Sequence, residues 1–178
     1  MGLISADFKN IVEGMISSIK ASTDPMQTLG TVRANVKLMG QQYQESKVRN
    51  FTLVCDEPIT SGGTDRGTTP LDFFAASVGF CENVTIARHA ALYGLNFDSL
   101  ETSIRGHWER KGQFDISGAD PSFKDMTVET KVTTKDPIEK VVEVVKLAHR
   151  RCPMHATISK AMKVVDKLYV NGQEVAIA

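Results

Sequence analysis

The fold is decided by one apolar stretch, residues 69–94, which reads TPLDFFAASVGFCENVTIARHAALYG. Its first residues follow the order of a helix start, with Thr69 as the N-cap, Pro70 at the first helical position and Asp72 three residues after the cap. Apolar side chains then continue on most sides as far as Tyr93, and Gly94 can end the helix in the left-handed conformation. We therefore expect a long, buried helix at the centre of the fold.

Alternating segments before and after this helix predict strands. On the N-terminal side we expect a strand over 31–39, a polar turn over 40–46, and the second strand of a hairpin over 47–55. On the C-terminal side we expect paired strands over 100–110 and 126–134, a helix over 136–151 that opens with a second capping signature, a helical piece over 153–160, and a hairpin closed by Asn171-Gly172. This order predicts an α+β fold whose strands curl around the central helix.

The first residues form a separate element. Apolar side chains recur with helical spacing over residues 3–22, and a short linker with Asp24-Pro25 follows. We therefore divide the chain into an N-terminal amphipathic helix, 1–22, and a main domain, 31–178. The apolar face of this helix is larger than the strands of one chain need, so we expect it to embrace a second subunit.

Composition limits the function. The chain has 178 residues, of which 42% are hydrophobic, and its 21 Lys and Arg balance 21 Asp and Glu. This predicts a soluble globular protein with no nucleic-acid footprint. No apolar run reaches the ~20 residues of a membrane span, so no membrane association is expected. Three unevenly spaced cysteines without a signal peptide favour a reducing, cytoplasmic location.

Sequence spacing predicts neither a cofactor nor a metal. The loop from Gly62 to Thr69 is close to a phosphate-binding loop, but it lacks the lysine, and Pro70 removes a backbone N–H. The cysteines and histidines have none of the spacings of zinc ligands. His155 follows Cys152 by three residues, so it is either a base beside that thiol or a partly exposed helical histidine.

Two cysteines are candidates for chemistry. Cys81 lies in the middle of the apolar helix, where a thiol is usually inert packing. Cys152 directly precedes Pro153, which opens a helix, and the N–H groups of a helix start favour a thiolate. If the fold brings the two together, they form a reactive and a resolving thiol.

The residues around both cysteines resemble a known family. The segment 67–81, GTTPLDFFAASVGFC, resembles the signature of the OsmC/Ohr family, which comprises osmotically inducible protein C and organic hydroperoxide resistance proteins. Cys152-Pro153, followed by Ala156-Thr157, is similar to the second motif of that family. The resemblance extends from Thr31 to the closing hairpin and leaves out the N-terminal helix.

The resemblance implies an OsmC-like fold, in which antiparallel sheets wrap around a long central helix in an intertwined homodimer. It also implies an antioxidant, stress-response enzyme, a thiol-dependent peroxidase whose substrate is an organic hydroperoxide. Cys81 would attack the peroxide as a thiolate and form a sulfenic acid, and Cys152 would resolve it as a disulfide. An external dithiol would reduce that disulfide.

The sequence departs from the Ohr branch where the thiolate is supported. A glutamate of that branch is replaced by Leu71, with Asp72 next to it, and the turn that carries its arginine reads Met39-Gly40-Gln41-Gln42 here. We predict that Asp72 and Arg49 support the thiolate, with Arg33, Arg66 and Arg88 as alternatives for the arginine. The departures keep a second function open, a non-catalytic OsmC-like dimer that binds a small apolar ligand.

Overall fold

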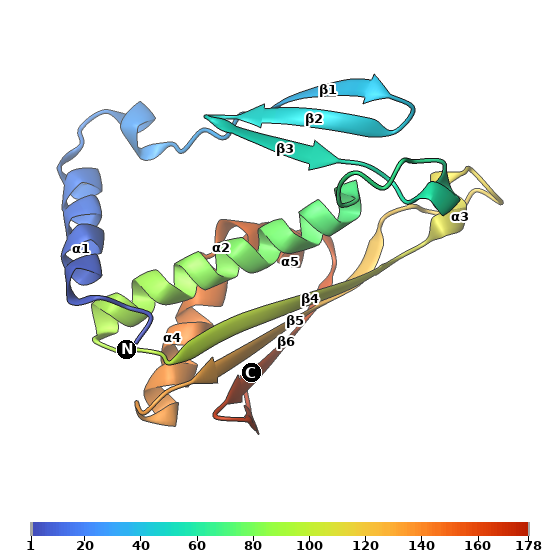
Figure 1. The fold of residues 1–178 in the computed structure, drawn as a ribbon. Coiled ribbons are helices and arrows are strands. Elements are labelled where there is room, and N and C mark those ends of the chain that lie inside the picture. The colour runs from blue at the N-terminus through green and yellow to red at the C-terminus, as the bar shows by residue number, and fades with distance from the viewer. Residues whose placement is uncertain (1, 178) are drawn as a thin grey trace. The chain divides into compact units, whose positions relative to one another are not determined.

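The structure is a computed structural model that describes residues 2–177, and the chain divides into two compact units. One unit comprises Ile19–Phe74, and the other comprises the residues up to Ser18 together with those from Ala75 onward. Helix α1 (Ala6–Ala21) and helix α2 (Pro70–Tyr93) each cross a boundary between the two units. Both helices are labelled in Figure 1.

The unit Ile19–Phe74 holds a three-stranded antiparallel sheet in the order β1 (Asn35–Gly40), β2 (Tyr43–Val48), β3 (Phe51–Cys55), flanked by two short 3₁₀ turns, η1 (Pro25–Thr28) and η2 (Ile59–Ser61). The prediction of a turn over 40–46 and one strand over 47–55 is wrong, because the polar segment 43–48 is a strand of its own. Glu45 pairs with Lys37 on one side and with Val54 on the other. Pairing on both edges, rather than side-chain hydrophobicity, makes β2 a strand.

Helix α2 begins and ends as its sequence predicts. The Thr69 amide donates to Asp72 Oδ2 at 3.3 Å, and the Asp72 amide donates to Thr69 Oγ1 at 3.2 Å. These reciprocal bonds form a capping box. The helix ends at Tyr93, after which Gly94 adopts φ +70°. A side chain is strained at that φ, so glycine suits the position.

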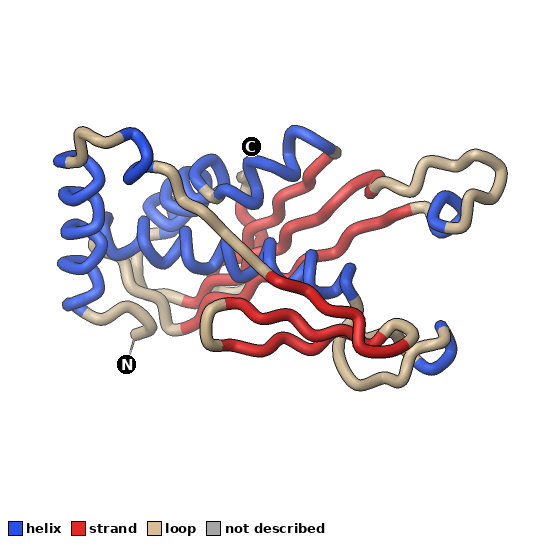
Figure 2. The backbone as a smooth tube through the Cα atoms, turned by 90° about the horizontal axis from the view of Figure 1, so that it is seen from above, coloured by secondary structure: helices blue, strands red, loops and turns tan. Residues whose placement is uncertain are grey.

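The second unit holds a four-stranded sheet in the order β4 (Ser99–Trp108), β5 (Phe123–Thr133), β6 (Lys163–Val170), β7 (Gln173–Val175). The short helix α3 (Arg110–Gln113) lies in the connection between β4 and β5. The pairs β4–β5 and β6–β7 are antiparallel as predicted, but β5 and β6 are parallel. A parallel pair needs a crossover, and α4 (Ile138–Arg151) with α5 (Pro153–Ala161) supplies it. Figure 2 shows the strands and helices by colour.

Two local predictions in this unit have different outcomes. Asn171 and Gly172 both have positive φ, +50° and +81°, so the β6–β7 hairpin has the two-residue turn predicted for it. The capping signature at Asp136 is wrong, because the N-cap of α4 is Pro137, without a side-chain hydrogen bond. Asp136 instead accepts the Asn96 amide at 2.7 Å, which ties the start of α4 to the end of α2.

The core of the second unit joins α2, α4, β5 and β6. Its fully buried members include Ile86 on α2, Val144 on α4, Val132 on β5 and Leu168 on β6. The N-terminal segment is attached to the same unit, since the Leu3 amide donates to the Phe97 carbonyl at 2.8 Å. Among the residues described, no helix is both long and apolar enough to cross a membrane.

Candidate functional site

Cys152 lies at the junction of two helices. It is both the C-cap of α4 and the N-cap of α5, with φ −72° and ψ 118°. This extended backbone follows from Pro153, since a proline disfavours helical geometry in the residue before it. The Cys152 sulfur accepts the His155 amide at 3.5 Å and so caps α5, and the side chain is fully buried.

The fold brings Cys152 and Cys81 together. Cys81 lies in the middle of α2 and is partly buried, and its side chain lies close enough to that of Cys152 to influence the pKa of the Cys152 thiol. Burial raises the pKa of the Cys152 thiol to about 12, and the contact with Cys81 and the charge of Glu82 act in the same direction. The His155 amide opposes this shift. Cys152 is therefore a protonated thiol at neutral pH, able to donate to the Cys81 sulfur.

The acidic residue predicted to support the thiolate is engaged in the capping box. Asp72 accepts hydrogen bonds from the Thr68 and Thr69 hydroxyls at 3.2 and 2.7 Å. The Thr69 hydroxyl is the main reason that the pKa of Asp72 lies below its usual value, while burial opposes the shift. Nine residues separate Asp72 from Cys81 on α2, which corresponds to about 13 Å along an ideal helix.

The candidate arginines are all exposed. Arg49 lies in the turn between β2 and β3 with φ +55°, and its guanidinium lies 5.8 Å from the centre of the Phe51 ring. The Arg66 guanidinium stacks on the Tyr43 ring at 3.8 Å. Arg88 lies on α2, and Arg33 precedes β1.

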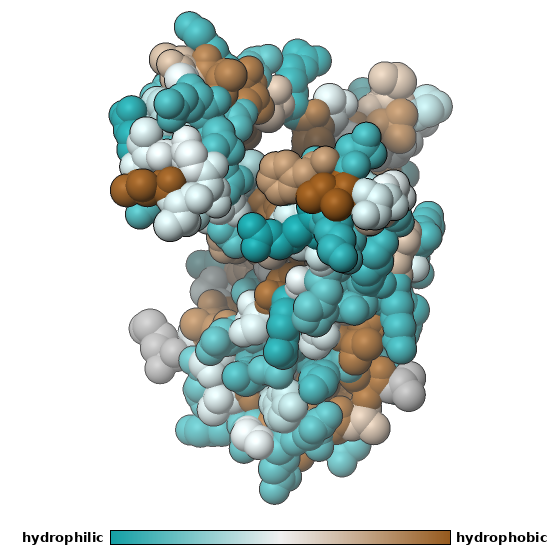
Figure 3. Space-filling model, turned by 90° about the vertical axis from the view of Figure 1, so that its right-hand side faces the viewer, coloured by the Kyte–Doolittle hydropathy of each residue, from teal (hydrophilic) through white to brown (hydrophobic). Residues whose placement is uncertain are grey.

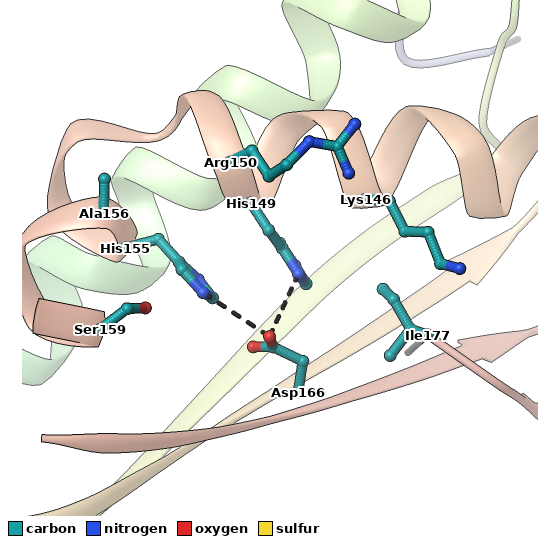
Figure 4. A pocket seen from close by; sticks show the side chains of 8 residues that line it. All are labelled: Lys146, His149, Arg150, His155, Ala156, Ser159, Asp166 and Ile177. Atoms are coloured by element: carbon teal, nitrogen blue, oxygen red, sulfur yellow. Dashed lines mark ion pairs between the residues drawn. The ribbon is translucent and has the colours of Figure 1, made fainter.

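A second group of polar side chains lies next to the thiols, and sequence reasoning missed it. Glu82, the residue after Cys81, is fully buried, and its Oε1 lies 2.6 Å from His155 Nδ1. His149 on α4 stacks on His155, with ring centroids 4.8 Å apart and planes inclined by 11°. Asp166 Oδ2 lies 3.6 Å from a nitrogen of each imidazole. We call Glu82, His149, His155 and Asp166 the carboxylate–histidine cluster; Figure 4 shows the two histidines and Asp166.

The cluster changes two interpretations of the sequence. His155 is buried and bonded to Glu82 rather than partly exposed, and His149 has partners that no spacing indicated. Burial lowers the pKa of His155, but the hydrogen bond to Glu82 and the charges of Asp166 and Glu82 outweigh it, so that the pKa is raised. Two signals point to the cluster, namely Glu82 within an apolar helix and Asp166 in register with the apolar face of β6.

A hollow lies between α2 and β4, and its lining residues on α2 lie on the opposite side of that helix from Cys81. Most of its lining is apolar or small, and it consists of Ala75, Ala76, Gly79, Phe80, Asn83, Thr102 and Ile104. Cys81 follows Phe80 in the chain, and Asn83 Oδ1 accepts the Thr102 hydroxyl at 2.7 Å across the hollow. The hollow is therefore a space for a small apolar group that lies across α2 from Cys81.

Comparison with known proteins identifies the family. The model of the family described as OsmC-like protein matches residues 63–165, which include both cysteines and three residues of the carboxylate–histidine cluster, Glu82, His149 and His155. The chain belongs to the OsmC-like protein family. No curated protein matches it significantly.

Solved structures of OsmC-like proteins have the same fold. The OsmC-like protein of Mycoplasma pneumoniae aligns with a TM-score of 0.70 and 14% identity, over 79% of this chain and 97% of that one. An organic hydroperoxide resistance protein OsmC of Legionella pneumophila, also described as a predicted redox protein, aligns with a TM-score of 0.61 and 17% identity, over 80% and 100%. An organic hydroperoxide resistance protein of Elizabethkingia anophelis gives 0.64 and 17%, over 82% and 100%. Membership of the OsmC-like family supports a redox-related role.

Proposed function

We propose that the protein is a thiol-dependent peroxidase for organic hydroperoxides, with Cys81 as the peroxidatic and Cys152 as the resolving cysteine. The observation that carries the proposal is that the fold brings the two thiols close enough for Cys81 to shift the pKa of Cys152, although the residues are 71 positions apart in the chain. Adjacent thiols need no large rearrangement to form a disulfide. The difference in their burial assigns the roles, since the partly buried Cys81 is within reach of a substrate and the fully buried Cys152 is not.

In the first step the Cys81 thiolate attacks the terminal oxygen of the hydroperoxide. An S–O bond forms, the O–O bond breaks, and the leaving alkoxide takes up a proton and departs as the alcohol. The sulfur is oxidised by two electrons to a sulfenic acid. The Cys152 thiol stands as a hydrogen-bond donor beside this sulfur, because its raised pKa keeps it protonated.

In the second step the Cys152 sulfur attacks the sulfenic sulfur of Cys81. An S–S bond forms and the S–O bond breaks. The hydroxide leaves and combines with the proton of the Cys152 thiol to form water. Cys152 still carries this proton because its pKa is raised. A dithiol from outside the chain then reduces the disulfide by exchange and is itself oxidised to a disulfide, which restores both thiols.

The substrate class is inferred from similarity, since two solved structures of the same fold are organic hydroperoxide resistance proteins. As part of this proposal, Asp72 and Arg49 support the Cys81 thiolate. We also propose that the chain divides into an N-terminal helix, 1–22, and a main domain, 31–178.

We also propose a homodimer, because an apolar sheet face is exposed to solvent. The register of the three-stranded sheet places Val36, Leu38, Phe51 and Leu53 on one face, and these side chains are 64%, 61%, 60% and 40% exposed. On α2, Phe80 is 70% exposed. Figure 3 shows hydrophobic residues, in brown, on the surface among hydrophilic ones. Exposed apolar area of this kind marks an interaction surface, and a second copy is the partner that we propose.

The first experiment treats the reduced protein with one equivalent of cumene hydroperoxide and follows intact mass and mapped peptides. A Cys81–Cys152 disulfide within seconds is the expected result. Thiols that remain reduced for many minutes would contradict the peroxidase and favour the ligand-binding dimer. Arg49→Gln should slow disulfide formation, while the matched variant Arg66→Gln should leave it unchanged. Sedimentation of the same samples tests the dimer.

A further inference from the structure

We propose that the carboxylate–histidine cluster binds one divalent transition-metal cation of the zinc type, with Glu82, His149 and His155 as ligands and Asp166 as the residue that orients both imidazoles. The cluster draws one residue from each of α2, α4, α5 and β6, so four separate elements converge on it. The inference is independent of the peroxidase proposal, because it assigns no role to either cysteine.

The first support comes from polar atoms without partners. Glu82 Oε2 and His149 Nε2 are buried and make no hydrogen bond among the residues described, although they lie 3.7 Å from each other. That distance is too long for a hydrogen bond and leaves both lone pairs free to converge on a third atom. Buried polar atoms are nearly always satisfied, so an unpaired oxygen and nitrogen that face each other indicate a missing partner.

The second support comes from charge. Within residues 2–177, the ion pairs of Glu82 and Asp166 are all with His149 and His155, and no lysine or arginine takes part. The cluster brings two carboxyl groups together, one of them fully buried on Glu82. Buried charges are paired or coordinate metals, and a single divalent cation neutralises both carboxylates.

The third support comes from the donor atoms and their arrangement. The stacked imidazoles each direct one nitrogen toward Glu82 and the other toward Asp166. Two imidazole nitrogens with one carboxylate is a donor set that zinc accepts. Asp166 Oδ2 lies at the opposite ring edges, 3.6 Å from a nitrogen of each imidazole, which is the side from which a carboxylate orients a metal-binding histidine.

The spacing of the ligand atoms permits closure around an ion. One ligand atom from each of Glu82, His149 and His155 lies within 4.8 Å of the others. Zinc–ligand bonds of about 2.0 Å require ligand atoms about 3.3 Å apart, so side-chain rotations that move the atoms by about 1 Å complete the site. Access is available from a pocket lined by His149, His155 and Asp166, with Lys146 and Arg150 at its edge (Figure 4).

The test uses the full chain, stripped with EDTA, freed of chelator and titrated with Zn²⁺ at pH 7.5 by calorimetry. We expect about one equivalent of tight binding. His149→Gln and His155→Gln should each weaken binding at least about tenfold, and Asp166→Asn should weaken it about tenfold through the orientation of the rings. The control is His107→Gln, an exposed histidine paired with Asp125, which should bind like the unaltered protein.

Two results would overturn the proposal. One is the absence of stoichiometric binding by the unaltered protein, which would mean that protons on the imidazoles neutralise the cluster. The other is binding that survives both histidine substitutions and disappears in the Cys81→Ser, Cys152→Ser double variant. Should the histidine variants fail to fold, X-ray absorption at the zinc edge of the unaltered protein decides instead. Imidazole and oxygen scattering supports the site, and sulfur scattering refutes it.

Discussion

Cys81 and Glu82 are neighbours in the chain but lie in different environments. Cys81 is partly buried and lies next to another thiol, whereas Glu82 is fully buried and hydrogen-bonded to an imidazole. Consecutive residues of a helix are rotated by about 100°, so Cys81 and Glu82 point to different sides of α2 and meet different neighbours. The difference teaches that α2 carries two sites, which we expect to respond differently to substitution.

The largest expected effect is that of Cys81 on the rate of hydroperoxide consumption. Cys81→Ser should lower organic hydroperoxide consumption by at least about a thousandfold, because the hydroxyl is a far weaker nucleophile than a thiolate. The measurement is peroxide loss with dithiothreitol as reductant. Cys55→Ser is the matched control, since Cys55 lies at the end of β3 in the other unit. A Cys81→Ser variant that keeps its activity would move the chemistry elsewhere.

The second largest expected effect is that of Glu82 on the free energy of unfolding. Glu82→Ala should lower the free energy of unfolding by about 3 kcal/mol, because it leaves a buried imidazole without its carboxylate. Cys81→Ala, one residue away, should cost less than about 2 kcal/mol. Urea unfolding of EDTA-treated protein measures both. Equal losses would mean that the two sides of α2 do not differ in this way.

A smaller expected effect is a difference in alkylation rate between Cys81 and Cys152. At pH 8, iodoacetamide should modify Cys81 at least about tenfold faster than Cys152, because Cys152 is buried and its pKa of about 12 keeps it protonated. Peptide mass spectrometry after timed quenching gives both rates. In guanidinium chloride the two rates should become similar, which shows that the fold and not the local sequence makes the difference.

The smallest effect concerns the start of α2. Thr69→Ala should destabilise the protein by about 1 kcal/mol, because it removes the hydroxyl that accepts the Asp72 amide. The pKa of Asp72 is lower in the folded protein than its ordinary value of 3.8. The ionised carboxylate therefore stabilises the fold above pH 3.8, and this contribution is lost as the pH falls through the lower, folded-state pKa. Asp72→Asn should lack that part of the pH dependence in urea titrations.

The sequence predicted those parts of the fold that local rules determine. The Thr69–Asp72 box, Gly94 and the Asn171-Gly172 turn act over a few residues, and each is found where it was expected. Strand β2 was missed because its polar residues are held by pairing on both edges. Asp136 was misassigned because its partner, Asn96, lies 40 positions away.

The candidate site was predictable only in part. The motifs located Cys81 and Cys152, but spacing could not reveal the carboxylate–histidine cluster, because Glu82 and His155 are 73 positions apart. The sequence does show a carboxylate inside an apolar helix, Glu82, and an aspartate among the alternating apolar residues of β6, Asp166. Each of these signals indicates a buried polar partner but does not identify it.

Cys152 is the single residue between α4 and α5, and this position affects the exchange of amide hydrogens at the start of α5. Its sulfur is the acceptor for the His155 amide at the first turn of α5. Any bond formed at that sulfur weakens the acceptor and loosens the turn. Deuterium uptake at the His155 amide should therefore be faster in oxidised than in reduced protein, so that this one amide reports the redox state of the chain.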